Sequence, residues 1–266
     1  MNFIDQVSVI EINPTELCNL KCNFCPRSTY YPNLNLNMSI DTARLIVEQL
    51  RQINYTGEVS ITGRGEPTLH PEFDELCEVF MEDRTWTLKI NTNGKNLQKW
   101  FSTIRKFDTV IYNVYEEDEW HLTIAQETYG HIENFKINHK PMGMEWFDRK
   151  NFTNRAGSFD TNHLPEDGRC EVIFLKLFID YDGTYRVCCE DWKTKIDMGN
   201  IYVTNIHDYV EYSEELADYR RHLIEGDRYK SPCSQCTHKI TDMKYGCTPK
   251  RWEQLEWQVK TENLGV

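Results

Sequence analysis

The stretch CNLKCNFC at residues 18–25 places three cysteines in one short segment, with the spacing C-x3-C-x2-C. A structural zinc site takes four protein ligands, and an iron–sulfur cubane is usually held by four thiolates. No fourth ligand is evident in the segment itself. The spacing therefore indicates a metal cluster with one corner left open, or a zinc loop that a distant residue such as His70 completes.

These cysteines lie in a chain in which strand-like runs alternate with helical periods. We predict strands over 7–12, 58–63, 86–94, 109–115 and 132–139, and helices over 39–53, 71–82, 96–107 and 117–128. Ser39 is placed to cap the first of these helices. The alternation predicts an α/β fold with a parallel sheet and helices on its outside.

Each unusual motif in this part of the chain lies at the end of a predicted strand. The cysteines follow the first strand, GRGEP (63–67) follows the second, NTNG (91–94) ends the third, and YNVY (112–115) ends the fourth. Ligands of parallel sheets bind at the carboxyl ends of the strands. We therefore expect these motifs to share one active site.

The composition excludes several classes of partner. The chain of 266 residues has a net charge of −12, whereas non-specific binding to nucleic acid or anionic membranes requires a basic surface. The first residues include Asp5 and Glu11 and lack the basic start of a signal peptide. The longest apolar run, at 172–179, is too short to span a bilayer and is interrupted by Lys176. We expect a cytoplasmic protein, in which ten cysteines favour metal or redox chemistry over disulfides.

A second group of cysteines begins where the composition changes, near residue 170. Its members are Cys170, Cys188, Cys189, Cys233, Cys236 and Cys247. Residues 172–189 predict two strands joined by Asp182-Gly183, which is a hairpin signal. Helices are predicted at about 206–225 and 250–262. Cys77, by contrast, lies on the apolar face of the predicted helix 71–82, and we expect it in the core.

The cysteine segment, with Phe24 before its last cysteine and GRGEP downstream, resembles the radical S-adenosylmethionine (SAM) superfamily. The resemblance implies a partial (β/α)6 TIM-like barrel. It also implies that Cys18, Cys22 and Cys25 hold three irons of a [4Fe-4S] cluster and that SAM chelates the fourth. An electron from the reduced cluster would then cleave SAM to a 5′-deoxyadenosyl radical, which abstracts a hydrogen from the substrate.

GRGEP is similar to the Gly-Gly-Glu-Pro element of this superfamily, which binds the methionine amino group, although Arg64 departs from the pattern. The strand ends that follow it are the other expected SAM contacts. The cofactor-binding residues implied in this way are Phe24, Gly63, Gly65, Glu66, Pro67, Asn91, Asn93, Tyr112 and Asn113. The alternative is that GRGEP and NTNG are ordinary turns.

The second cysteine group resembles the SPASM/twitch extension of the same superfamily. Its pattern is Cys170-x(12)-Gly183-x(4)-Cys188, followed by the C-x2-C pair Cys233 and Cys236. The resemblance implies an auxiliary [4Fe-4S] cluster on these four cysteines, and a zinc ribbon with the same ligands is the alternative.

The resemblance also divides the chain. It implies a barrel core at 1–160, a twitch domain at 161–249 and a C-terminal helix at 250–266, with 141–169 as a connector that includes one last short barrel element.

Three further residues are candidates for the chemistry. Arg155, in NRAG (154–157), matches a similar stretch of related enzymes and would bind a substrate anion or orient a hydroxyl; the alternative is an ion-paired surface arginine. Cys247 is either a spare thiol or a hydrogen-atom donor. Cys189 is expected to point away from Cys188, because side chains alternate along a strand, and so to pack rather than bind metal.

The resemblance leaves the reaction open. The arrangement resembles the twitch dehydrogenase type that oxidises 2-deoxy-scyllo-inosamine, in which the auxiliary cluster accepts the electron. Alternatives are epimerisation of a sugar or amino acid residue with Cys247 or Cys189 as donor, modification of a ribosomal peptide, and a zinc or iron–sulfur protein that only binds metal or carries electrons. Because the first predicted strand begins at residue 7, we expect no fused peptide-recognition domain before it, and a peptide substrate would then need a separate one. The expected partners are a sugar-like, amino acid or peptide substrate and a flavodoxin- or ferredoxin-type electron donor; nucleic acid is not expected.

Overall fold

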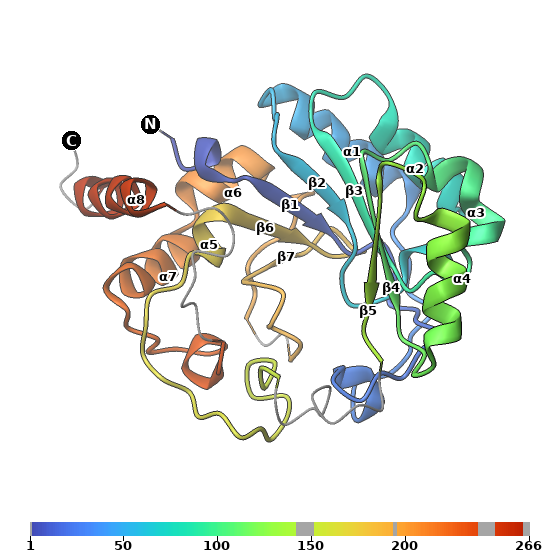
Figure 1. Ribbon diagram of the computed structural model, residues 1–266. Coiled ribbons are helices and arrows are strands. Elements are labelled where there is room, and N and C mark those ends of the chain that lie inside the picture. The colour runs from blue at the N-terminus through green and yellow to red at the C-terminus, as the bar shows by residue number, and fades with distance from the viewer. Residues whose placement is uncertain (1, 142–151, 194–195, 239–247, 263–266) are drawn as a thin grey trace.

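The computed structural model describes residues 2–141, 152–193, 196–238 and 248–262. Its centre is one curved sheet of seven strands in the order β5-β4-β3-β2-β1-β6-β7 (Figure 1). The strands are β1 (Val9–Ile12), β2 (Glu58–Ile61), β3 (Thr87–Thr92), β4 (Thr109–Val114), β5 (Phe135–His139), β6 (Lys176–Ile179) and β7 (Tyr185–Arg186). Every neighbouring pair is parallel except β6 with β7. Within the described residues, the sheet ends in β5 on one side and β7 on the other and does not close into a barrel.

Helices cover the outer face of this sheet, as the alternating pattern predicts. Those of the first part are α1 (Ile40–Gln52), α2 (Phe73–Met81), α3 (Leu97–Ile104) and α4 (Glu119–Tyr129), with short 3-10 turns η1 (Ile4–Gln6), η2 (Pro26–Ser28) and η3 (Pro67–Leu69). Ser39 caps α1, since its side chain accepts a hydrogen bond from the N–H of Thr42. The apolar stripe of α1 is buried at Ile40, Ala43, Ile46, Val47 and Leu50. The predicted elements of this part are thus confirmed, and most are shorter than predicted by a few residues, whereas α4 ends one residue later than predicted.

The second part of the chain joins the same sheet, which the sequence did not predict. Residues 172–175 form one helical turn, α5 (Val172–Leu175), and β6 then pairs in parallel with β1, with Val9 opposite Lys176. The predicted hairpin is therefore correct only for β6 and the short β7. The described residues 152–169 contain no strand, so β6, on the far side of β1, is the sixth parallel strand.

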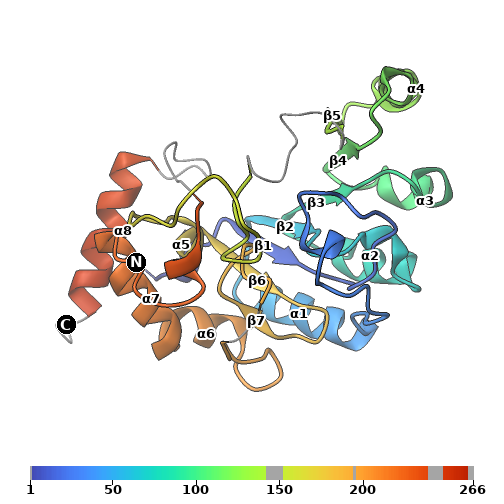
Figure 2. The same ribbon diagram turned by 90° about the horizontal axis from the view of Figure 1, so that it is seen from below.

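The remaining helices gather at the β6–β7 end of the sheet, whereas α4 lies at the β5 end (Figure 2). They are α6 (Ile206–Tyr212), α7 (Glu214–Glu225), the 3-10 turn η6 (Cys233–Gln235) and α8 (Pro249–Glu262). The prediction of a single helix over 206–225 is wrong, because the helix is interrupted at Ser213. That residue leaves the helical conformation, and its side chain caps α7 through the N–H of Leu216.

Two smaller expectations are also tested by the fold. Cys77 is fully buried in the core, as predicted. Among the described residues, the structure contains no helix with the length and apolar character needed to cross a membrane.

Candidate functional site

A cavity opens at the carboxyl ends of β1 to β4 and brings together most of the predicted site. The three cysteines of the first loop line it, together with side chains from beyond β6 and β7. The predicted residues among its lining are Cys18, Cys22, Phe24, Cys25, Gly63, Gly65, Glu66, Asn91, Asn93, Asn113, Arg155 and Cys188. The shared site that the motif positions predict is therefore present.

Two predicted SAM contacts, Pro67 and Tyr112, do not line this cavity. Pro67 is buried as the first residue of η3. Because side chains alternate along β4, Asn113 faces the cavity while Tyr112 points to the other side. There the Tyr112 ring lies against Gly94 and at 6.0 Å from the ring of Tyr129. The expectation that both Tyr112 and Asn113 reach the ligand is corrected by the pleat of the strand.

The three thiols of the first loop are shielded from water. Burial raises the pKa of Cys18 and Cys25 and raises that of Cys22 to about 12. They are thus protonated at neutral pH without metal, and metal binding has to release these protons. Within the described part of the chain, no group of three His, Cys, Asp or Glu side chains is arranged to hold a single metal ion. A four-iron cluster does not need such a group, since its thiolates bind separate irons.

His70, which the zinc interpretation offered as a distant fourth ligand, is occupied elsewhere. It is buried, with Nε2 at 2.8 Å from the carbonyl oxygen of Met38 and Nδ1 accepting from the N–H of Glu72. Both ring nitrogens therefore bind backbone groups. Neither is free to complete a site with the three cysteines.

The GRGEP loop requires both of its glycines. Gly63 has a φ of +116°, and a Cβ there would lie 2.4 Å from Oδ1 of Asn13. A Cβ on Gly65 would lie 2.1 Å from the carbonyl oxygen of Thr15. The loop thus packs directly against the segment that leads into the cysteines, in a way that excludes side chains at these two positions.

Glu66 connects this loop to the end of β3. It is buried, and its carboxylate accepts hydrogen bonds from the hydroxyls of Thr68 and Thr92, each at 2.7 Å, and from the N–H of Asn93 at 2.7 Å. Burial raises its pKa, whereas these hydrogen bonds lower it. Asn93 in turn donates from Nδ2 to Oδ1 of Asn19 at 2.7 Å. The glycine loop, the third strand end and the cysteine loop are therefore one hydrogen-bonded unit.

Phe24 packs into an aromatic group beside the cysteines. Its ring stacks on Phe152 at 5.1 Å and lies 5.9 Å from Tyr115, which also lines the cavity. Burial raises the pKa of Tyr115 well above its ordinary value. These rings form a dry wall on one side of the cavity.

The opposite wall contains charged residues that the sequence analysis did not assign to the site. Glu11 on β1 lines the cavity, and its carboxylate lies 3.8 Å from Nζ of Lys176 on the neighbouring β6. Burial raises the pKa of Glu11, and Lys176 opposes that effect. The sequence did contain a signal for Glu11 and Lys176, because each is a charged residue within an otherwise apolar central strand. Trp192, which the sequence could not place, also lines the cavity.

A second cavity adjoins the first and contains all four cysteines expected to bind the auxiliary cluster. Its lining is Ala156, Cys170, Val172, Cys188, Cys189, Glu190, Leu223, Arg228, Pro232, Cys233, Cys236 and His238. Burial raises the pKa of Cys188 strongly, that of Cys233 to about 12 and that of Cys236 to about 11. Four thiols in one enclosed, mostly apolar site suit a four-thiolate iron–sulfur cluster.

The NRAG segment lies between the two cavities. Arg155 and Ala156 both have a φ of +47°, an uncommon conformation for residues with side chains. Asn154 holds this turn, because its Nδ2 donates to the carbonyl of Gln235 at 2.7 Å and its Oδ1 accepts from the N–H of Thr237 at 3.1 Å. The turn is thereby fixed to the segment that carries Cys236.

Arg155 itself points into the first cavity and is paired rather than free. Its Nη1 donates to Oε1 of Glu190 at 2.7 Å, and the hydroxyl of Thr153 donates to Oε2 of the same carboxylate at 2.6 Å. Glu190 raises the pKa of Arg155, so the guanidinium remains charged. It is suited to bind or orient a polar group, not to accept a proton.

Cys189 differs from its expected position. It lines both cavities, as Cys188 does, because the two residues lie beyond β7 in a turn where the alternation of a strand no longer applies. Its thiol lies near Glu190 and Glu11, and burial is the main cause of its raised pKa. Cys247, the other candidate hydrogen donor, lies outside the described residues.

Two family models match the chain. Residues 12–115 match the radical SAM superfamily, and residues 170–237 match the SPASM iron-sulfur cluster-binding domain. Each match encloses one of the cysteine sets described above.

Several known proteins are similar to this chain. The S-adenosyl-L-methionine-dependent 2-deoxy-scyllo-inosamine dehydrogenase of Niallia circulans is 25% identical over 241 residues, which are 87% of this chain and 93% of that enzyme. A GTP 3′,8-cyclase of Pasteurella multocida is 31% identical over 93 residues, 34% of this chain but only 27% of the cyclase. Among solved structures, BtrN in complex with AdoMet and 2-DOIA has a TM-score of 0.73 at 24% identity, covering 87% of this chain and 93% of BtrN. Streptococcus suis SuiB bound to the precursor peptide SuiA has a TM-score of 0.58 at 15% identity, covering 87% of this chain and 70% of SuiB.

Proposed function

Because this chain belongs to the radical SAM superfamily, we propose that it catalyses a SAM-dependent oxidation of a small polar molecule. The observation that carries this proposal is the adjacency of the two cavities. Cys188 and Cys189 lie in the wall between them, so an electron acceptor on the four cysteines would adjoin the substrate. The similar enzyme of Niallia circulans is a dehydrogenase.

The cysteines provide the cofactor sites. We propose that the SAM-binding [4Fe-4S] cluster is held by Cys18, Cys22 and Cys25, and the auxiliary cluster by Cys170, Cys188, Cys233 and Cys236. Together with SAM, these cofactors supply reductive cleavage of SAM, abstraction of a substrate hydrogen atom and an acceptor for the remaining electron. The SAM contacts expected from the cavity are Phe24, Gly63, Gly65, Glu66, Asn91, Asn93 and Asn113.

Oxidation of a secondary alcohol to a ketone also releases the hydroxyl proton, which requires a base. Glu11 is suited to this role, since its carboxylate faces the cavity and burial raises its pKa above that of an ordinary glutamate. Arg155 cannot accept the proton, because Glu190 keeps it charged; it would instead hold a substrate hydroxyl in place. Lys176 would keep Glu11 ionised until substrate enters.

The direct test is anaerobic reconstitution with iron and sulfide, followed by SAM, a strong reductant and a panel of polyhydroxylated amines that includes 2-deoxy-scyllo-inosamine. We expect 5′-deoxyadenosine in one-to-one ratio with a ketone product. Substrate deuterated at the reacting carbon should transfer its label to 5′-deoxyadenosine. Absence of 5′-deoxyadenosine under all conditions would instead favour a protein that only binds metal or carries electrons.

One observation favours epimerisation as a second candidate. Cys189 places a thiol in the cavity wall, where it is able to return a hydrogen atom to the substrate carbon. In deuterium oxide such a reaction incorporates solvent deuterium into the product, whereas oxidation does not. Incorporation that disappears in Cys189→Ala would establish the epimerase.

The partners follow from this proposal in outline. A small-molecule substrate is favoured by the dehydrogenase relative, while the complex of SuiB with SuiA keeps a peptide substrate as an alternative. A flavodoxin- or ferredoxin-type protein would supply the electron, and a cytoplasmic location remains our expectation. The electron donor is tested by measuring product formation with a purified flavodoxin or ferredoxin in place of the chemical reductant.

A further inference from the structure

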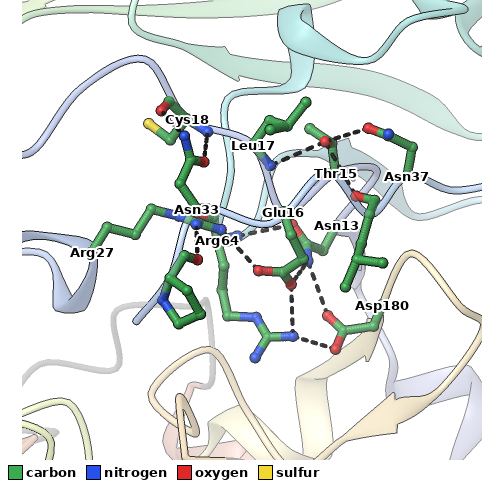
Figure 3. Close-up of polar contacts among 12 residues, drawn as sticks. Asn13, Thr15, Glu16, Leu17, Cys18, Arg27, Asn33, Asn37, Arg64 and Asp180 are labelled. Carbon is green, nitrogen blue, oxygen red and sulfur yellow. Dashed lines mark hydrogen bonds and ion pairs between the residues drawn. The ribbon is translucent and has the colours of Figure 1, made fainter. Parts of the chain in front are cut away.

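Four charged side chains converge behind the cysteine loop, in a group that the reaction itself does not use. They are Glu16, Arg27, Arg64 and Asp180 (Figure 3). Their side chains are only 1%, 3%, 9% and 3% exposed, respectively. They come from three segments far apart in the sequence, namely the cysteine loop, the glycine loop and the end of β6.

The first pair closes the cysteine loop. Glu16 lies two residues before Cys18, and Arg27 lies two residues after Cys25. Their ion pair joins Nη2 to Oε2 at 2.8 Å. The segment that carries all three thiols is therefore held at both ends by a buried salt bridge.

Arg64 connects this pair to the rest of the site. Its Nη2 lies 3.1 Å from Oε1 of Glu16 and donates to Oδ2 of Asp180. Its backbone is held as well, because its N–H donates to Oδ1 of Asn13 at 3.0 Å and its carbonyl accepts from Nε of Arg27 at 2.5 Å. One arginine thus joins the glycine loop to the cysteine loop and to the end of β6.

Both carboxylates of the group have partners other than Arg64. Asp180 also accepts from Arg186, and its Oδ1 accepts from Nδ2 of Asn13 at 3.1 Å, so it has partners without Arg64. Glu16 likewise keeps Arg27. Removal of Arg64 leaves two carboxylates, Glu16 and Asp180, and two arginines, Arg27 of the group and Arg186 beside it, with no carboxylate unpaired. Since buried ion pairs contribute little net stability, fixing relative position is the better account of why such a group is present.

We propose that Arg64 is a positioning residue, which fixes the cysteine loop and the glycine loop relative to each other and to the end of β6, so that SAM can contact both loops at once. This inference rests on the proposed binding of SAM in the first cavity. Arg64 stands where the superfamily element has glycine, so its ion pairs are a feature of this chain and not of the motif. Its side chain also borders the cavity, with the guanidinium 5.9 Å from the ring of Trp192.

The test is the variant Arg64→Gln, with SAM affinity as the readout. Titration of SAM into the reduced protein, followed by the electron paramagnetic resonance signal of the cluster, measures the dissociation constant. We expect it to rise about tenfold, while iron content and thermal stability remain those of the parent. Arg64→Lys keeps the charge but replaces the planar guanidinium by a compact ammonium, and we expect an intermediate value. Arg84→Gln, which breaks the ion pair with Asp108 at the other end of the strands, is the matched control and should leave the dissociation constant unchanged.

Two outcomes would overturn the inference. One is an unchanged dissociation constant for SAM in Arg64→Gln. The other is loss of iron or of the folded state in Arg64→Gln together with parent-like affinity in Arg64→Lys, which would assign Arg64 a purely structural role. A parent protein that binds SAM but oxidises nothing would refute the proposed function and leave this inference intact.

Discussion

The two cysteine sites of this protein are built in opposite ways. The first takes three thiols from one loop of eight residues, and that loop is tied down by polar and charged side chains. The second takes four thiols from segments between residues 170 and 236, and these meet in a mostly apolar cavity. A short sequence motif is sufficient to define the first site. The second site, by contrast, forms only when α5, the turn after β7 and η6 pack together.

This difference has a functional meaning. A loop that supplies three ligands leaves the fourth position for a ligand from solution, whereas the second site supplies four thiols from three segments and needs no further ligand. The first site is therefore suited to a substrate-binding cluster, and the second to a cluster that only exchanges electrons. Substitutions in the two sites should separate these roles.

The largest effect is expected at the first site. Cys22→Ala removes one of three ligands, and we expect complete loss of 5′-deoxyadenosine formation together with loss of about half of the bound iron. Iron analysis and chromatography of the reaction measure both. Cys77→Ala is the matched control, since Cys77 is a buried cysteine of the core, and it should retain all of the iron. Normal cleavage of SAM by Cys22→Ala would refute the assignment of the first site.

The same change in the second site should separate SAM cleavage from substrate oxidation. Cys233→Ala removes a ligand of the auxiliary cluster, and we expect SAM cleavage to continue while oxidised product falls by about a hundredfold or more. The ratio of 5′-deoxyadenosine to product, which we expect to be one in the parent, should rise accordingly. A variant that keeps this ratio at one would show that the second site does not accept the substrate electron.

Next in size is the effect of Glu11→Gln, which tests the candidate base in the first cavity. Loss of a positioned base should lower the rate of product formation about a hundredfold without changing iron content. The parent rate should fall as the pH drops, because Glu11 must be ionised to accept a proton. Burial raises its pKa, so this fall should occur at a higher pH than for an ordinary carboxyl group, and the variant should lack it. An acid limb that persists in Glu11→Gln would exclude this residue as the base.

The comparison also explains how much the sequence could predict. Alternating strands and helices, and the motifs at their ends, were sufficient for the first half, because each signal is local. The pairing of β6 with β1 was not predictable from periodicity, since the two strands are more than 160 residues apart. Arg64 was visible as a departure from the motif, but its partner Asp180 lies directly after β6, the strand whose pairing with β1 was not predicted. Ser213, followed by two glutamates, was a readable helix start that the sequence analysis overlooked.

The smallest expected effect concerns a group of ion pairs that connects the segment before Cys233 to α7. Lys230, three residues before Cys233, binds Glu215 at 2.7 Å and also Asp218, both on α7. Partial burial raises the pKa of Asp218, but hydrogen bonds from Lys230 and Tyr229 outweigh it and bring the value to about 2. These side chains are partly exposed, and solvent screens their interaction, so Lys230→Ala should lower the unfolding free energy by only about 0.5–1 kcal/mol at neutral pH.

The pH dependence of that difference distinguishes the ion pair from simple loss of packing. A carboxylate whose pKa is lowered by folding stabilises the folded state at pH values above its pKa in the unfolded chain, which is about 3.9. This contribution is lost as the pH falls toward 2, the pKa of Asp218 in the folded protein. The gap between parent and Lys230→Ala should therefore be present in urea unfolding at pH 7 and smaller at pH 3. Lys260→Ala, which removes a more exposed pair with Glu256 on α8, should have a smaller effect at pH 7. A Lys230→Ala deficit that stays constant with pH, or that exceeds the expected range and is accompanied by loss of auxiliary iron, would show that Lys230 supports the second site by packing rather than by charge.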